Sequence, residues 1–274
     1  MILEFSDDLD LKKIADSGQC FRWEELPDGG FRVPHKDSCL IIRKLSEDSY
    51  ELSCSEDEYE SMWKDYLDAD TDYRSIRGRI SKKKDPFLYA AAADQQGIRI
   101  LKQDPWEALI SFIISQNRNI PAIKRSIELL CERVGMLRKD PEGGKYYSFP
   151  DAKAINEMPD TALAECRLGY RDEYIRRTAA LVCEGSLDIN GLMLCSEEEA
   201  FERLISLHGV GKKVASCVML FGLHFVNAFP IDVWVKRILE NEYPKGYPME
   251  EYAPYNGIYQ QYMFAWYRHR GEQA

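Results

Sequence analysis

Lys213 and Asp232 are the residues of this sequence whose types and positions best fit covalent chemistry. Lys213 falls in the first turn of a helix predicted near 212–223, where the helix dipole and partial burial disfavour the ammonium form. The uncharged amine is the more nucleophilic form. Asp232 follows Pro230 at the start of another predicted helix, near 231–240. The dipole there favours the carboxylate, which can stabilise a developing cation or help to move the proton of the lysine.

Two glycines stand immediately before this lysine. Gly209 and Gly211 separate a helix predicted near 197–207 from the one that begins at about Lys212. They let the backbone turn tightly, and the first amide groups of the second helix then face outward, where a phosphate oxygen can accept their hydrogen bonds. The segment is typical of a helix–hairpin–helix and predicts DNA contacts at Gly209, Val210 and Gly211. A plain helical hairpin fits the glycines equally well, and a lone surface Lys–Asp pair is usually structural.

The secondary structure that must position Lys213 and Asp232 changes along the chain from strands to helices. Residues 20–54 read as short strands, with a hairpin signal at Pro27-Asp-Gly-Gly30 and a polar turn at Ser46-Glu-Asp48. Asp85-Pro86 and Asp104-Pro105 each fit an N-cap followed by the first helical position. Helices are predicted near 86–95, 105–114, 121–134, 151–166, 171–185, 197–207, 212–223, 231–240 and 256–269. We therefore predict an α+β protein, with an N-terminal antiparallel sheet domain (1–95) packed on a mostly helical body (96–274).

The amino-acid composition limits the classes of function that the protein can have. The 274 residues are 45% hydrophobic and 30% charged, as expected for a soluble globular protein. No stretch approaches the roughly 18 apolar residues of a membrane span, and the N-terminus lacks a secretory pattern. We therefore expect no membrane partner and, for a bacterial source, a cytoplasmic, nucleoid-associated protein. The net charge of −10 argues against broad phosphate binding and, taken alone, favours a small-molecule enzyme. A nucleic-acid function therefore has to be supported by the sequence motifs.

The eight cysteines do not form a metal or disulfide pattern. They are scattered, none belongs to a CxxC or CxxH, and the four-cysteine run of an iron–sulfur cluster is missing. We expect most of them to be buried, reduced and structural. No metal site and no cofactor are predicted, since the nucleophile comes from the protein itself. A cation held by hairpin carbonyls near 207–212 is left open, because side chains do not report on it.

The segments GVGKK (209–213) and AFPIDVWVKRI (228–238) resemble the helix–hairpin–helix DNA glycosylases, and specifically the 8-oxoguanine DNA glycosylase/AP lyases. Three further segments support the narrower resemblance. Ser17-Gly-Gln-Cys-Phe-Arg-Trp23 is similar to the N-terminal SGQxFRW segment of that family. Ser115-Gln-Asn-Arg-Asn-Ile120 is similar to its asparagine-rich loop, and Leu168-Gly-Tyr-Arg171 to its intercalating loop. Together these segments span nearly the whole chain.

The resemblance implies a bifunctional repair enzyme that removes 8-oxoguanine from duplex DNA. Lys213 would form a Schiff base with C1′ of the sugar, followed by β-elimination, and Asp232 would be its catalytic carboxylate. The backbone carbonyl of Gly18 would accept N7–H, a hydrogen that unmodified guanine lacks, and glycine permits the close approach. The partner would be double-stranded DNA containing 8-oxoguanine, and we expect a monomer.

The resemblance also assigns the flipped-base pocket. Cys217 and Phe264 would sandwich the base, and Gln260 would hydrogen-bond its Watson–Crick edge. Cys217 lies four residues after Lys213, on the same helix face, so that thiol and amine could form a charged pair. Taken alone, Gln260 and Phe264 would be surface and core residues.

Contacts to the rest of the duplex follow in the same way. Asn117 and Arg171 would contact the orphaned base, Tyr170 would wedge into the vacated gap, and the loop with Arg118 and Asn119 would contact DNA. Two positions depart from the family pattern. Ala122 stands where many members carry an arginine that reads the opposite cytosine, which predicts a relaxed opposite-base preference. Trp234 stands where vertebrate members place a phosphate-contacting histidine.

Three other interpretations fit part of the sequence. An endonuclease III-like glycosylase for another damaged base is disfavoured by the missing cysteine cluster and by the Ser17–Trp23 segment. A monofunctional alkylated-base glycosylase would keep Asp232 but has no need of Lys213. A non-catalytic DNA-binding helix–hairpin–helix protein predicts no attack on a sugar, and leaves Lys213, Asp232, Cys217 and Phe264 without a shared purpose.

Overall fold

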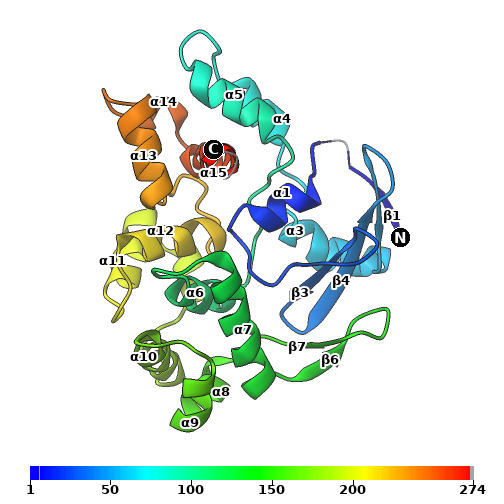
Figure 1. The fold of residues 1–274 in the computed structure, drawn as a ribbon, viewed down its shortest axis with the longest axis vertical. Coiled ribbons are helices and arrows are strands. Elements are labelled where there is room, and N and C mark those ends of the chain that lie inside the picture. The colour runs from blue at the N-terminus through cyan, green and yellow to red at the C-terminus, as the bar shows by residue number, and fades with distance from the viewer. Residues whose placement is uncertain (6, 272–274) are drawn as a thin grey trace.

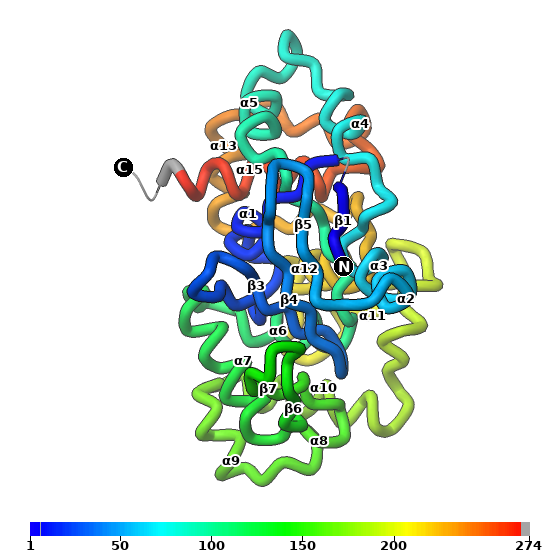
Figure 2. The backbone as a smooth tube through the Cα atoms, turned by 90° about the vertical axis from the view of Figure 1, so that its right-hand side faces the viewer, coloured from blue at the N-terminus to red at the C-terminus, as the bar shows by residue number. Residues whose placement is uncertain are grey.

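A five-stranded antiparallel sheet forms the N-terminal part of the protein (Figures 1 and 2). The structure is a computed structural model and describes residues 1–5 and 7–271. The strand order is β1-β5-β4-β3-β2. The strands are β1 (Ile2–Glu4), β2 (Glu24–Glu25), β3 (Phe31–His35), β4 (Ser38–Lys44) and β5 (Ser49–Leu52). All their pairings are antiparallel, and sequence neighbours pair from β2 to β5, as hairpin connections produce.

Helices make up most of the rest of the chain. The shorter ones are α1 (Leu11–Asp16), α2 (Glu56–Glu58), α3 (Lys64–Tyr66), α4 (Tyr73–Gly78), α8 (Ala152–Glu157), α9 (Asp160–Glu165) and α14 (Met249–Tyr252). The longer ones are α5 (Pro86–Asp94), α6 (Pro105–Ile114), α7 (Ile120–Val134), α10 (Arg171–Cys183), α11 (Glu197–Ile205), α12 (Lys212–Phe221), α13 (Val233–Glu242) and α15 (Asn256–Gly271). The predicted α+β class is confirmed. None of the helices in the described residues is long and apolar enough to cross a membrane.

Two predicted elements differ from the structure. Residues 21–23 do not form a strand, because Phe21 is buried in the helical core and Trp23 in the core of the sheet. The single helix predicted over 151–166 is two helices, α8 and α9, separated at Met158-Pro159. A proline has no amide to donate and forces the preceding residue into extended backbone, so the helix ends there.

Several elements were not predicted. A second hairpin, β6 (Leu137–Lys139) paired with β7 (Lys145–Tyr147), turns at Gly143-Gly144, where Gly143 has a φ of +87°. The segment 56–66 forms α2, a π-helical turn (Tyr59–Trp63) and α3. Trp63 and Tyr66 of that segment are buried against the sheet. Their apolar side chains are too few and too unevenly spaced to predict a helix from periodicity.

Each half of the protein has its own hydrophobic cluster. The cluster under the sheet contains residues between Phe5 and Leu67, together with Leu101. The larger cluster lies among the helices and already includes Tyr73, Ile76 and Leu88. The domain division between residues 95 and 96 stays a prediction.

Asp85 and Asp104 are the N-caps that the sequence predicts. The Asp85 carboxylate accepts from the Leu88 amide at 2.9 Å, and that of Asp104 accepts from the Glu107 amide at 2.9 Å. Asp85 also accepts the hydroxyls of Tyr243 and Tyr252 at 2.8 and 2.9 Å. One carboxylate therefore ties the start of α5 to the segment that connects α13 with α15.

Substitution of Asp85 tests this tie. We expect Asp85→Ala to lower the free energy of unfolding by about 3 kcal/mol, because it removes a cap and leaves two tyrosine hydroxyls without their acceptor. Asp151→Ala, which removes only the cap bond to the Ala154 amide, should cost about 1 kcal/mol. Urea denaturation of both variants measures the difference, and equal losses would show that the two tyrosine contacts contribute nothing.

Candidate functional site

Lys213 and Asp232 lie at the starts of two neighbouring helices in the sequence, as predicted. Lys213 is the second residue of α12, and its Nζ lies 5.5 Å from the ring centroid of Phe112 on α6. Asp232 is the N-cap of α13, and its carboxylate accepts the Val235 amide at 2.8 Å. The Asp232 carboxylate thus lies at the N-terminal, positive end of the α13 dipole.

The helix–hairpin–helix consists of α11, the turn at 206–211 and α12. Gly209 has a φ of +82°, and a Cβ there would lie 2.2 Å from the ring of Tyr174, so no side chain fits. The Gly209 carbonyl accepts from Nε2 of Gln116 at 3.0 Å, which ties the turn to the end of α6. Val210 is buried and anchors the hairpin in the helical core.

The start of α12 has no side-chain cap, unlike α5, α6, α7 and α13. Gly211 occupies the N-cap position, and a Cβ built there would meet no atom within 4 Å. The first amide groups of a helix have no partner within the helix. An uncapped, open helix start is therefore available to a phosphate oxygen, as the sequence predicts for Gly211.

An inner cavity of about 50 Å³ collects the predicted catalytic and base-binding residues. Lys213 and Cys217 come from α12, Asp232 from the start of α13, Gly18 from the loop after α1, and Gln260 and Phe264 from α15. The lining is completed by Ser17, Phe112, Phe221, Pro230 and Gln261. All six predicted residues thus line one cavity, although they are up to 246 positions apart in the sequence.

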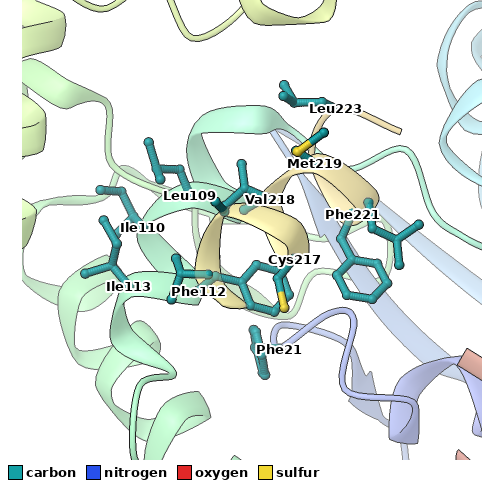
Figure 3. Packing of buried hydrophobic residues seen from close by; sticks show 14 of the residues in the cluster. Phe21, Leu109, Ile110, Phe112, Ile113, Cys217, Val218, Met219, Phe221 and Leu223 are labelled. Atoms are coloured by element: carbon teal, nitrogen blue, oxygen red, sulfur yellow. The ribbon is translucent and has the colours of Figure 1, made fainter. Parts of the chain in front are cut away.

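Three aromatic rings, those of Phe21, Phe112 and Phe221, pack near Cys217 at the wall of the cavity (Figure 3). Phe112 of α6 stacks on Phe221 of α12, with ring centroids 5.4 Å apart and an interplanar angle of 21°. Phe21 meets Phe112 edge-on at 5.5 Å. Because aromatic pairs of this kind fix the relative placement of their helices, the thiol has a rigid support.

Burial raises the pKa of the Cys217 thiol, and the nearby Lys213 amine opposes this shift without reversing it. Asp232 adds to the increase. The thiol is therefore neutral near pH 7. The charged thiolate–ammonium pair suggested by the sequence is not favoured here, since desolvation outweighs the attraction between the two groups.

Gly18 lies in a left-handed conformation, with a φ of +76°, which favours glycine. A Cβ there would lie 3.6 Å from Cε1 of Phe264, in ordinary contact, so the backbone conformation is the stronger requirement. The neighbouring Gln19 is fully buried and fixes the loop. Its amide donates to the Arg99 carbonyl and accepts from the Leu101 amide, both at 2.9 Å.

Two outer grooves meet the inner cavity at Lys213 and Asp232. One, of about 360 Å³, runs along Arg118, Asn119 and Trp234. The other, of about 920 Å³, is lined by the predicted DNA-contacting residues Asn117, Arg118, Asn119, Tyr170 and Gly211. Its cations are Arg118, Lys213 and Lys236, against the single carboxylate of Asp232. This groove is therefore locally basic despite the net charge of −10.

The side chains around the larger groove differ in their exposure and in the hydrogen bonds that hold them. Tyr170 is 52% exposed, which suits a wedge. Arg171 is only 6% exposed; its guanidinium donates to the carbonyls of Gln116 and Leu168 and stacks on Tyr170. Contact between Arg171 and a base would require these bonds to be exchanged. Arg118 donates to Ser126 Oγ at 2.8 Å, and Asn119 caps α7.

Sequence reasoning missed several residues of the inner cavity. Phe112 and Phe221 fall within the helices predicted near 105–114 and 212–223 but received no role, and Gln261 gave no signal beside the assigned Gln260. Gln19 lay within a recognised motif but received no role. Among the described residues no group of three or more His, Cys, Asp or Glu could hold a metal ion. All eight cysteines are free thiols, and Cys183 is exposed.

Two family models together match residues 1–244 of the chain. Residues 1–109 match the family model described as "8-oxoguanine DNA glycosylase, N-terminal domain". Residues 110–244 match "HhH-GPD superfamily base excision DNA repair protein". An N-glycosylase/DNA lyase of Saccharomyces cerevisiae is 33% identical over 260 residues, covering 86% of this chain and 69% of the relative. An N-glycosylase/DNA lyase OGG1 of Arabidopsis thaliana is 31% identical, covering 85% and 66%.

Solved structures agree over nearly the whole chain. MBOgg1, in complex with a low-affinity DNA ligand, is 37% identical with a TM-score of 0.92, covering 98% of this chain and 96% of that one. The 8-oxoguanine glycosylase/lyase of Clostridium acetobutylicum, bound to double-stranded DNA with cytosine opposite 8-oxoG, is 33% identical with a TM-score of 0.89, covering 100% and 99%. The chain therefore belongs to the 8-oxoguanine DNA glycosylases of the HhH-GPD superfamily.

Proposed function

We propose that this protein is a base-excision repair DNA glycosylase/AP lyase that removes 8-oxoguanine from duplex DNA. The observation that carries the proposal is the inner cavity, where Lys213 and Asp232 lie beside Gly18, Cys217, Gln260 and Phe264. That cavity opens at Lys213 onto a basic groove next to an uncapped helix. The names of the relatives, N-glycosylase/DNA lyase and 8-oxoguanine glycosylase/lyase, agree with it.

Recognition of the lesion uses the walls of the cavity. The extruded base stacks between Cys217 and Phe264, and Gln260 faces its Watson–Crick edge. The Gly18 carbonyl accepts N7–H, which only the oxidised base carries, whereas unmodified guanine would present a lone pair to that oxygen. A neutral Cys217 thiol suits a stacking wall, because it brings no charge against the π-face.

The covalent step begins with attack of the Lys213 amine on C1′ of the sugar. A C1′–N bond forms, the C1′–N9 bond breaks, and the base leaves with that electron pair and takes up a proton. Opening of the sugar ring gives an iminium ion at C1′. Loss of a C2′ proton then expels the 3′ phosphate by β-elimination. Asp232 stabilises the positive charge that develops at C1′ and the nitrogen.

The duplex is held by the large groove and the hairpin. Amide groups at the start of α12, with Gly209, Val210 and Gly211 shaping the turn, bind a backbone phosphate. Tyr170 fills the gap in the stack, while Asn117 and Arg171 face the orphaned base, with Arg118 and Asn119 beside them. We propose that the protein acts as a monomer and without a cofactor.

Trapping with borohydride tests the nucleophile. The protein mixed with an 8-oxoguanine duplex and borohydride should give a covalent protein–DNA adduct, because the reagent reduces the imine. Lys213→Gln should abolish the adduct. Lys212→Gln, which changes the adjacent exposed lysine, should still give it. An adduct that persists in Lys213→Gln, or its absence in the unsubstituted protein, would sink the mechanism.

The carboxylate is tested by Asp232→Asn. An asparagine can still cap α13, so the fold should be retained while the negative charge is lost. We expect the single-turnover excision rate to fall by roughly 100-fold, the scale on which loss of an electrostatic stabiliser acts. Asp104→Asn, a matched change at the N-cap of α6 outside the cavity, should leave the rate near its original value. Equal rates in both variants would remove Asp232 from the chemistry.

Opposite-base preference is tested at Ala122. Without an arginine there, excision rates opposite the four bases should differ by less than about tenfold, since Asn117 and Arg171 must act without the cytosine-reading arginine that many family members carry at this position. Ala122→Arg should raise the preference for cytosine, and it keeps the amide that Asn119 caps. Single-turnover rates with each opposite base decide the point. A strong cytosine preference in the unsubstituted protein would contradict it.

A further inference from the structure

Gln261 lines the inner cavity and carries a buried hydrogen-bond acceptor, Oε1, that has no partner among the described residues. It lies next to Gln260 on α15, is 3% exposed and lines the same cavity. Within the part of the chain that the structure describes, Oε1 of Gln261 has no hydrogen-bond partner. Buried polar atoms in folded proteins are nearly always paired, so an unpaired one at a ligand cavity calls for a partner from the ligand.

The orientation of this amide is fixed by a chain of bonds that starts at the backbone. Nε2 of Gln260 donates to the Pro230 carbonyl at 3.1 Å. A carbonyl can only accept, so Oε1 of Gln260 must point the other way, where it accepts from Nε2 of Gln261 at 3.3 Å. The remaining atom of Gln261, Oε1, is therefore an acceptor and not a donor.

Two acceptors on adjacent, hydrogen-bonded amides match one kind of base edge. A guanine-type base carries two adjacent donors, N1–H and the exocyclic amino group, on its Watson–Crick edge. An adenine-type base has an acceptor at N1 and only a C–H at position 2. Oε1 of Gln260, with one lone pair directed to Gln261, can accept from one guanine donor, and Oε1 of Gln261 is free for the other.

We propose that Gln261 is a second base-reading residue, whose Oε1 accepts a hydrogen bond from the exocyclic amino group of 8-oxoguanine. This inference rests on the proposed function and adds to it a specificity contact. Gln261 Nε2 also holds the Gln260 amide in the orientation that reads the same edge. The pair thus selects an oxidised purine that bears the amino group.

The test compares 8-oxoguanine with 8-oxohypoxanthine, which differs only by lacking the exocyclic amino group. Single-turnover excision is measured with each lesion opposite cytosine. The unsubstituted protein should excise 8-oxoguanine about tenfold faster, the effect of one buried hydrogen bond. In Gln261→Met, which keeps the length of the side chain without its amide, the two rates should become equal.

Gln95→Met is the matched control. Gln95 is also a buried glutamine, but it lies outside the inner cavity and its amide donates to Asp94. This variant should keep the tenfold preference. Rates are divided by the yield of borohydride trapping on an abasic duplex, which counts the folded, DNA-bound protein whatever base is offered.

Two outcomes would overturn the inference and leave the proposed function intact. The first is equal rates on both lesions in the unsubstituted protein, which would do so even if Gln261→Met failed to fold. The second is an unchanged preference in Gln261→Met: with both rates lowered it would reduce Gln261 to a packing residue, and with both rates unchanged it would give the contact to another group. No excision of 8-oxoguanine by the folded, unsubstituted protein would remove both the inference and the proposed function.

Discussion

The open start of α12 is the constraint around which the site is built. Many helices begin with a side chain that accepts a hydrogen bond from the first turn, but Gly211 has no side chain to do so. In the turn before it, the ring of Tyr174 leaves no room for a side chain at Gly209. The same turn of helix then carries amide groups that can hold a phosphate and a lysine that can attack a sugar. Capping it would stabilise the helix and close the anion site. The fold keeps this end exposed by anchoring the hairpin elsewhere, through buried Val210 and the bond from Gln116 to the Gly209 carbonyl.

The cavity beside Lys213 depends on parts of the chain that are far apart in sequence. Gly18 reaches it from the N-terminal half, because the buried Gln19 bonds to residues 99 and 101, which run between the two clusters. Phe112 and Phe221 lock α6 to α12, and α15 brings Gln260 and Phe264 from the end of the chain. The residues proposed to recognise the base are thus brought together only by packing, whereas the proposed nucleophile, Lys213, and its carboxylate, Asp232, lie within one segment of the sequence. The two family models divide the site accordingly: Gly18 lies in the first (1–109), Lys213, Cys217 and Asp232 lie in the second (110–244), and Gln260 and Phe264 lie beyond both.

That division also decides what could be predicted from sequence. Lys213, Asp232 and the hairpin follow from local spacing and helix-start chemistry, and the structure places them at helix starts as expected. Gly18, Cys217, Gln260 and Phe264 needed the family resemblance, since no local rule joins them. Gln261 escaped notice because consecutive glutamines on a helix read as a solvated face, and only packing shows that both are buried. The hydrogen bonds that hold Arg171 depend on tertiary contacts and could not be predicted in the same way. The break at Pro159 was missed for another reason, because the hydrophobic periodicity of 151–166 was given more weight than the proline.

The distribution of acid explains how a chain with a net charge of −10 can present a basic groove. Glu56–Glu58 and Glu197–Glu199 occupy the first turns of α2 and α11, where the positive end of the dipole stabilises them. The first turn of α12 holds no acid and two lysines instead. Among the residues that line the groove at this helix start, the only carboxylate is Asp232, whose charge has a part in the proposed chemistry. Exposed charges are screened beyond about 8–10 Å, so the charges that line the groove matter more for phosphate binding than the net charge of the chain.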